Sequence, residues 1–164
     1  MFYEEILSEF QKKKVRYVIA GGLAVNLLGS FRSTADLDIL VEMSDENLAK
    51  IVRILTQKGY RVKQPVDPMG IANTNTRRDW IKNKHMKAFN FYKEEAFKEV
   101  DIIIESPVSF EQAIKSAKRI KCGQLTLWVM SVDHLIKMKK KANRDIDKID
   151  IYELNRIKRN GRLA

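Results

Sequence analysis

The sequence contains a single cysteine and no long apolar run. Cys122 therefore cannot form an intramolecular disulfide, and a chain without a disulfide framework fits a reducing compartment. No apolar stretch approaches the ~20 residues that a membrane span needs, and the N-terminus lacks the basic and apolar segments of a signal peptide. We therefore expect a cytoplasmic protein without a membrane partner.

Acidic residues are also scarce relative to basic ones. Lysine and arginine total 31 of the 164 residues against 21 aspartates and glutamates, which gives a formal net charge of +10. Such an excess favours a polyanionic partner, with nucleic acid as the first candidate. A lysine-rich surface on an ordinary soluble protein explains the same excess, so that alternative stays open.

Hydrophobic periodicity divides the chain into alternating helices and strands. We predict helices from the start to about residue 13 and over 21–28, 45–58, 76–82, 110–117 and 131 to the end. We predict strands over 15–20, 35–41, 60–62, 86–92, 100–105, 120–122 and 125–129. This order predicts an α/β (α+β) fold, with a mixed β-sheet flanked by helices and a short C-terminal helical segment.

The C-terminal segment shows two apolar stripes at helical spacing, which we expect to face the core. The first consists of Leu135, Ile136, Met138 and Ala142, and the second of Ile149, Tyr152, Leu154 and Ile157.

Two carboxylates one residue apart are the most informative feature. Asp36 and Asp38 lie in a predicted strand, where alternate side chains share a face, so both point the same way. Two like charges so close are costly unless a cation lies between them. The pair Gly21-Gly22 lies earlier in the chain, between a predicted strand and a helix, where backbone N–H groups can approach a phosphate. Together these features indicate phosphoryl transfer.

A third acid lies alone in an apolar strand. Asp101 is flanked by Val100 and Ile102, and a lone carboxylate there is expensive unless it is paired or acts as a ligand. If its strand lies beside that of Asp36 and Asp38, three carboxylates converge. With nucleotide phosphates they would hold one or two Mg²⁺ ions, and Asp101 would be the natural general base for an acceptor hydroxyl.

These motifs resemble the DNA polymerase β-type nucleotidyltransferase superfamily, and more closely its abortive-infection (AbiEii-like) and minimal members. Three parts of the sequence carry the resemblance. The first motif consists of residues 21–25 and 32–38, and the middle segment of residues 76–80, 89–92 and 100–101. The helical motif consists of residues 135–139 with Arg144, Asp147 and Asp150. The resemblance implies that residues 1–130 form the catalytic domain and that residues 131–164 form a helical segment packed on it as part of one compact unit.

The resemblance also implies roles for single residues. Gly21 and Gly22 would hold the β- and γ-phosphates of a nucleoside triphosphate. Asp36 and Asp38 would bind Mg²⁺, and Asp101 would complete the metal site or act as the base. Lys139 would reach the triphosphate. The remaining predicted nucleotide-site residues are Asp147 and Asp150, which would orient Lys139 or the acceptor, and Arg32 and Thr34, either of which could touch phosphate.

The acceptor is open at this point. The basic charge favours RNA, for example a tRNA 3′ end, and a protein side chain is a second macromolecular acceptor. Either would suit a toxin that works with a cognate antitoxin. The alternatives are a small-molecule (antibiotic) nucleotidyltransferase and a catalytically idle nucleotide-binding or antitoxin module.

Overall fold

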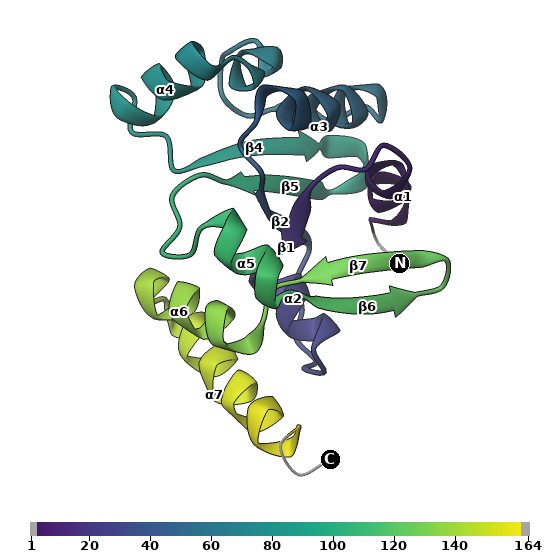
Figure 1. Ribbon diagram of the computed structural model, residues 1–164, viewed down its shortest axis with the longest axis vertical. Coiled ribbons are helices and arrows are strands. Elements are labelled where there is room, and N and C mark those ends of the chain that lie inside the picture. The colour runs from purple at the N-terminus through teal and green to yellow at the C-terminus, as the bar shows by residue number, and fades with distance from the viewer. Residues whose placement is uncertain (1–2, 162–164) are drawn as a thin grey trace.

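The computed structural model describes residues 3–161 and contains a mixed sheet of seven strands flanked by helices (Figure 1). The strand order is β3-β4-β5-β2-β1-β7-β6. The strands are β1 (Tyr17–Ile19), β2 (Asp36–Val41), β3 (Arg61–Val62), β4 (Ala88–Lys93), β5 (Lys98–Ile103), β6 (Lys118–Cys122) and β7 (Leu125–Val129). The pair β2–β5 and the pair β1–β7 are parallel, and the other neighbours are antiparallel, so the predicted mixed sheet is confirmed.

Nine helical segments accompany the sheet within residues 3–161. The α-helices are α1 (Glu4–Lys12), α2 (Gly21–Leu27), α3 (Asp45–Gln57), α4 (Thr74–Lys82), α5 (Phe110–Ser116), α6 (Val132–Ala142) and α7 (Asp145–Asn160). Two short 3-10 helices are η1 (Pro68–Ala72) and η2 (Glu94–Ala96). Within the described part of the chain, no helix has the length and apolar character needed to cross a membrane.

Several helices begin at side chains that satisfy otherwise unpaired backbone N–H groups. The hydroxyl of Ser44 accepts a hydrogen bond from the backbone N–H of Asn47 at the start of α3. Ser109 forms a reciprocal capping box with Gln112 at α5. Such caps define where these two helices start, and the observed starts at Asp45 and Phe110 agree with the predicted ones.

The core lies largely on the face of the sheet that α1 and α3 cover, although the central strand β1 is buried on both faces. Helix α1 contributes Ile6, Leu7 and Phe10, and α3 contributes Leu48, Ile51 and Leu55, all of them buried. Alternate residues of β4 and β5, among them Phe91 and Val100, are fully buried with them. The residues between these, such as Asn90 and Asp101, are only partly buried, and they lie on the other face.

The C-terminal segment corrects one prediction. It forms two helices separated at Asn143, which takes a left-handed conformation with φ of +52°. On α7 the buried side chains are Asp147, Asp150 and Leu154, whereas Ile149 and Tyr152 are 60% and 64% exposed. The prediction that the second stripe faces the core was therefore wrong at these two positions. It was also wrong for Ala142 of the first stripe, which is exposed. Charged residues take the buried face because they find ionic partners, as described below.

Candidate active site

The two acid-bearing strands lie side by side. In the parallel pair of β2 and β5, Asp38 is directly opposite Asp101, and Asp36 is directly opposite Glu99. Because side chains two residues apart share a face, Asp36, Asp38 and Asp101 all belong to the same face of the sheet. The predicted adjacency of the third acid to the first two is thus present in the fold, although 62 residues separate Asp38 from Asp101.

The turn at Gly21 contacts Asp38, the central acid of this group. Strand β1 ends beside the start of β2, and the backbone N–H of Ala20 donates a hydrogen bond to the carbonyl oxygen of Asp38 at 2.9 Å. Gly21 has φ of +60°, and a Cβ placed on it would lie 1.7 Å from Oδ2 of Asp38. Only glycine fits there, because the Asp38 carboxylate occupies the space of its missing side chain.

The loop before β2 covers the second glycine. A Cβ on Gly22 would lie 2.7 Å from Oγ1 of Thr34 and 2.8 Å from Nη2 of Arg32. Asn26 of α2 holds this loop, since its side-chain amide donates to the carbonyl oxygen of Arg32 at 2.8 Å. Nε of Arg32 is buried and has no hydrogen-bond partner among residues 3–161. Arg32 and Thr34 therefore lie at the glycine turn, as the phosphate-contact hypothesis requires.

Crowding of negative charge changes the acidity of the site. Burial raises the pKa of Asp38 to about 6, and the neighbouring charges of Asp101 and Asp36 add to the rise. Lys139 and Arg144 act in the opposite direction on Asp38. The pKa of Asp101 is raised by burial as well, and its hydrogen bond from Asn90 partly offsets the effect. The acid cluster thus carries negative charge that its surroundings only partly neutralise.

A buried ionic network connects α6 and α7 with the loop over Gly22. Nζ of Lys139 lies 3.0 Å from Oδ1 of Asp147 and 2.6 Å from Oδ2 of Asp150. Arg32 reaches the same Oδ2 of Asp150 at 2.7 Å, and Arg144 contacts Asp147 at 2.8 Å. Burial raises the pKa of Asp147, but hydrogen bonds from Arg144 and Lys139 outweigh it and lower this pKa to about 2. Both aspartates are 1% exposed, so they are not ordinary surface pairs.

A tyrosine outside the predicted set holds the two acid strands at one end. The hydroxyl of Tyr3 lies 2.5 Å from the carbonyl oxygen of Ala35 and 2.7 Å from that of Glu99, to which it can donate, and it accepts from the backbone N–H of Glu99 at 3.1 Å. It therefore connects the residue before Asp36 with the residue opposite Asp36.

The structure brings all ten predicted residues into one continuous region, because Arg32 joins the glycine turn to Asp150 and hence to Lys139 and Asp147. Sequence reasoning did not assign roles to Tyr3, Asn90 or Arg144. A signal existed for Asn90, a lone amide between Phe89 and Phe91. Nothing in the local pattern distinguishes Tyr3.

As the side chains lie, no three His, Cys, Asp or Glu residues in the described range 3–161 form a group that could hold a metal ion. Metal binding by Asp36, Asp38 and Asp101 therefore remains a proposal.

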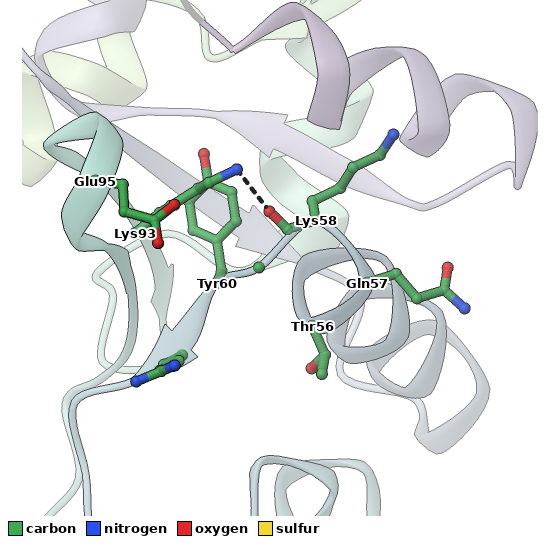
Figure 2. Close-up of a pocket in the computed structure, with 8 residues that line it drawn as sticks. Thr56, Gln57, Lys58, Tyr60, Lys93 and Glu95 are labelled. Atoms are coloured by element: carbon green, nitrogen blue, oxygen red, sulfur yellow. Dashed lines mark hydrogen bonds between the residues drawn. The ribbon is translucent and has the colours of Figure 1, made fainter.

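Figure 2 shows a hollow away from the acids, at the β3 end of the sheet. Its lining includes Lys58, Tyr60 and Lys93, and none of the ten predicted residues. The Lys93 ammonium donates to the carbonyl oxygen of Lys58 at 2.9 Å and lies 5.9 Å from the centre of the Tyr60 ring. The hollow contains neither the glycine turn nor the paired aspartates, so it does not reproduce the arrangement at Gly21 and Asp38.

A model of one protein family, described as aminoglycoside-2″-adenylyltransferase, matches residues 3–154. The chain belongs to this family. It is a nucleotidyltransferase, as the sequence predicted. The closer resemblance to AbiEii-like proteins is not shown by these comparisons. A search of curated protein sequences found no match.

Solved structures share the fold at low sequence identity. The lincosamide antibiotic adenylyltransferase LnuA with bound lincomycin is 18% identical with a TM-score of 0.64, and the match covers 95% of this chain and 96% of LnuA. ANT(2″)-Ia in complex with adenylyl-2″-tobramycin is 16% identical with a TM-score of 0.59, covering 92% of this chain and 83% of that chain. The α/β nucleotidyltransferase fold is therefore established for the chain.

Proposed function

We propose that this nucleotidyltransferase moves a nucleoside monophosphate from a Mg²⁺-bound nucleoside triphosphate to a hydroxyl group of a small antibiotic-like molecule. The observation that carries the proposal is the contact of the Asp38 carboxylate with the Gly21 turn, directly opposite Asp101. A phosphate held at the turn would lie against the acids. Family membership supports a small acceptor rather than the RNA or protein acceptor that we first expected.

The residues present suit magnesium. Mg²⁺ prefers oxygen ligands and is usually bound by one or two carboxylates together with substrate phosphates. Asp36 and Asp38 supply such oxygens and Asp101 a third set, and their mutual repulsion adds to the effect of burial in raising the pKa of Asp38. When bound, the metal neutralises charge on the reacting phosphates. The carboxylates by themselves do not complete a site, so the nucleotide would have to contribute ligands.

We assign the chain's own residues as follows. Asp101 accepts the proton of the acceptor hydroxyl, whose oxygen forms a bond to the α-phosphorus. The bond from that phosphorus to the bridging oxygen of the β-phosphate breaks, and pyrophosphate leaves with the electron pair. Gly21 and Gly22 approach the β- and γ-phosphates through their backbone N–H groups. The buried Nε of Arg32, a donor that lacks an acceptor among the described residues, suits a phosphate oxygen.

The C-terminal helices would complete the nucleotide site. Lys139 and Arg144 act on Asp38 electrostatically, which supports their placement near the phosphates. Asp147 and Asp150 hold Lys139 from two sides, and this supports the expectation that they orient it. We accordingly retain the division into a catalytic part, residues 1–130, and a helical segment, residues 131–164, that packs on it.

One observation still favours RNA, namely the net charge of +10. The basic residues that we would neutralise are Arg77, Arg78, Lys82, Lys84, Lys137, Lys140 and Lys141. Arg77 is unsuitable, because it is 8% exposed and its guanidinium contacts Asp45 and the carbonyl oxygens of Ile71 and Met43. The other residues belong to two separate regions: α4 with the segment that follows it, and α6. In Figure 1, α4 lies at the top of the molecule and α6 in its lower half. This arrangement weakens the case for one RNA-binding surface.

A transfer assay tests the proposal. The protein is incubated with Mg²⁺ and each of the four α-labelled triphosphates, with tobramycin, lincomycin or total RNA as acceptor, and products are detected by mass spectrometry and gel electrophoresis. We expect a nucleotidylated small molecule, which disappears with Asp38→Ala and persists with Asp145→Ala, a change at an exposed carboxylate. If the label were found only in RNA, the proposed small-molecule acceptor would be wrong and RNA would be the acceptor. Absence of any labelled product would contradict the proposal.

A further inference from the structure

A side-chain amide lies directly opposite the proposed base. Asn90 of β4 is paired with Asp101 of β5 in the antiparallel register, on the face that carries Asp36 and Asp38. Its Nδ2 donates a hydrogen bond of 2.8 Å to Oδ1 of Asp101. No group in residues 3–161 donates a hydrogen bond to the other oxygen, Oδ2. One carboxylate oxygen is thus held while the second is left for a substrate.

A second amide holds the first. Gln64 follows the edge strand β3, and its Nε2 donates to Oδ1 of Asn90 at 2.8 Å. Its Oε1 accepts from the backbone N–H of Asn90 at 3.3 Å, and Nε2 also contacts the carbonyl oxygen of Ala88 at 3.4 Å. Gln64 therefore forms hydrogen bonds with both the side chain and the backbone of Asn90.

The direction of every hydrogen bond in this chain follows from the carboxylate. An ionised Asp101 can only accept, so Asn90 must turn its NH₂ group toward it. The carbonyl oxygen of Asn90 then faces Gln64 and needs a donor, which Nε2 supplies. A flip of either amide would place two acceptors or two donors against each other. The network has one satisfied arrangement, and this arrangement fixes the Asp101 carboxylate.

Core packing does not account for the two amides. The buried side chains of β4, Phe89 and Phe91, belong to the other face of the strand. Asn90 and Gln64 are only partly buried, so the fold itself does not require amide side chains at their positions; apolar or other polar residues would pack there equally well. Their shared feature is the path of hydrogen bonds that ends at Asp101.

We propose that Asn90, locked by Gln64, is a positioning residue that holds Asp101 in the orientation required for nucleotidyl transfer. The inference rests on the proposed function, in which Asp101 receives the proton of the acceptor. Supporting groups of this kind typically contribute roughly 10- to 100-fold to activity.

Crystal structures of the wild type, Asn90→Ala and Gln64→Glu, all without metal or nucleotide, test the positioning directly. Gln64→Glu keeps the size of the side chain but removes the group that donates to Asn90, so it tests the same positioning if Asn90→Ala fails to fold. We expect the Asp101 carboxylate to rotate or to take more than one orientation in both variants. The matched control is Tyr92→Phe, two residues along the same face of β4 and opposite Glu99, where Asp101 should keep its wild-type orientation. An Asp101 carboxylate that keeps the wild-type orientation in Asn90→Ala or Gln64→Glu overturns the proposal.

Kinetics supply the second readout, with ATP and tobramycin or lincomycin as substrates. We expect kcat to fall roughly 10- to 100-fold in both amide variants, with KM for ATP and the melting temperature unchanged. Unchanged kcat, or a loss that follows only the melting temperature, overturns the proposal. If the wild type modifies no acceptor, the proposed function fails, and the orientation of Asp101 in the crystals alone decides the inference.

Discussion

Two charged regions of this protein are built on opposite principles. Asp38 and Asp101 bring like charges together on neighbouring strands. Burial raises the pKa of both groups; the charges of Asp101 and Asp36 add to the rise at Asp38, and those of Asp36 and Glu99 add to it at Asp101. The network around Lys139 brings unlike charges together, and its hydrogen bonds outweigh the effect of burial and lower the pKa of Asp147 to about 2. The first region carries unbalanced charge, and the second is balanced internally.

The difference separates charges kept for chemistry from charges kept for structure. Backbone pairing and the Tyr3 hydroxyl hold the acids, so the fold keeps them together although their charges oppose it. Lys139 bridges Asp147 and Asp150, and its removal leaves these two buried carboxylates with Arg144 and Arg32, respectively, as their remaining cationic partners. The two regions should therefore respond differently to substitution.

The largest contrast is expected for Asp38→Ala. Loss of this carboxylate should reduce nucleotidyl transfer more than roughly 1,000-fold, on the scale of removing a principal transition-state contact. At pH 7 the melting temperature should stay level or rise, because a pKa raised to about 6 means that the folded state disfavours the ionised form. Transfer assays and calorimetry of the same preparation check both parts. Retained turnover, or a clear loss of stability, would show that the acids are structural.

Lys139→Met should produce the reverse pattern in stability. The change leaves Asp147 and Asp150 buried beside each other without their shared cation, at a cost of about 3 kcal/mol in the free energy of unfolding. Urea denaturation measures the loss. Lys140→Met is the control, since that neighbour is exposed and its removal should cost little. Equal effects of the two substitutions would contradict the buried-network interpretation.

Acid titration should reveal the same network. Asp147 has its pKa lowered from 3.8 to about 2, so it stabilises the folded state above pH 3.8, and this contribution is lost as pH falls through about 2. The loss should amount to roughly 2 kcal/mol. Asp147→Asn should remove this part of the acid dependence, whereas Asp145→Asn, at a 97% exposed side chain, should preserve it. Denaturation curves between pH 2 and 5 make the comparison.

The smallest effect is expected for Tyr3→Phe. Loss of the hydroxyl leaves the backbone groups of Ala35 and Glu99 without their shared partner, which should cost about 1 kcal/mol of stability. Tyr152→Phe is the matched control on an exposed side chain. Chemical denaturation of both variants decides whether the hydroxyl helps to hold the acid strands. Equal stability of the two variants would argue against that role.

Much of this fold and site was predictable because it depends on local chemistry. Period-two and period-3.6 patterns located most strands and helices, and the spacing of Asp36 and Asp38 is enough to put both on one face of a strand. The sequence also indicated a glycine turn between a strand and a helix, but not that the Asp38 carboxylate occupies the space beside Gly21. The acceptor substrate was harder to predict from the sequence, since the net charge favoured RNA whereas the family model favours a small molecule.

The sequence by itself therefore determined the glycine turn, the paired acids and the lone Asp101, because each follows from near neighbours in the chain. Only the tertiary structure decided which charges are buried. Pattern reasoning expected Ile149 and Tyr152 to face inward on α7, yet Asp147 and Asp150 do so. Their partners Lys139 and Arg32 lie on other elements, and the attraction that offsets the cost of burying a charge arises only when distant segments meet.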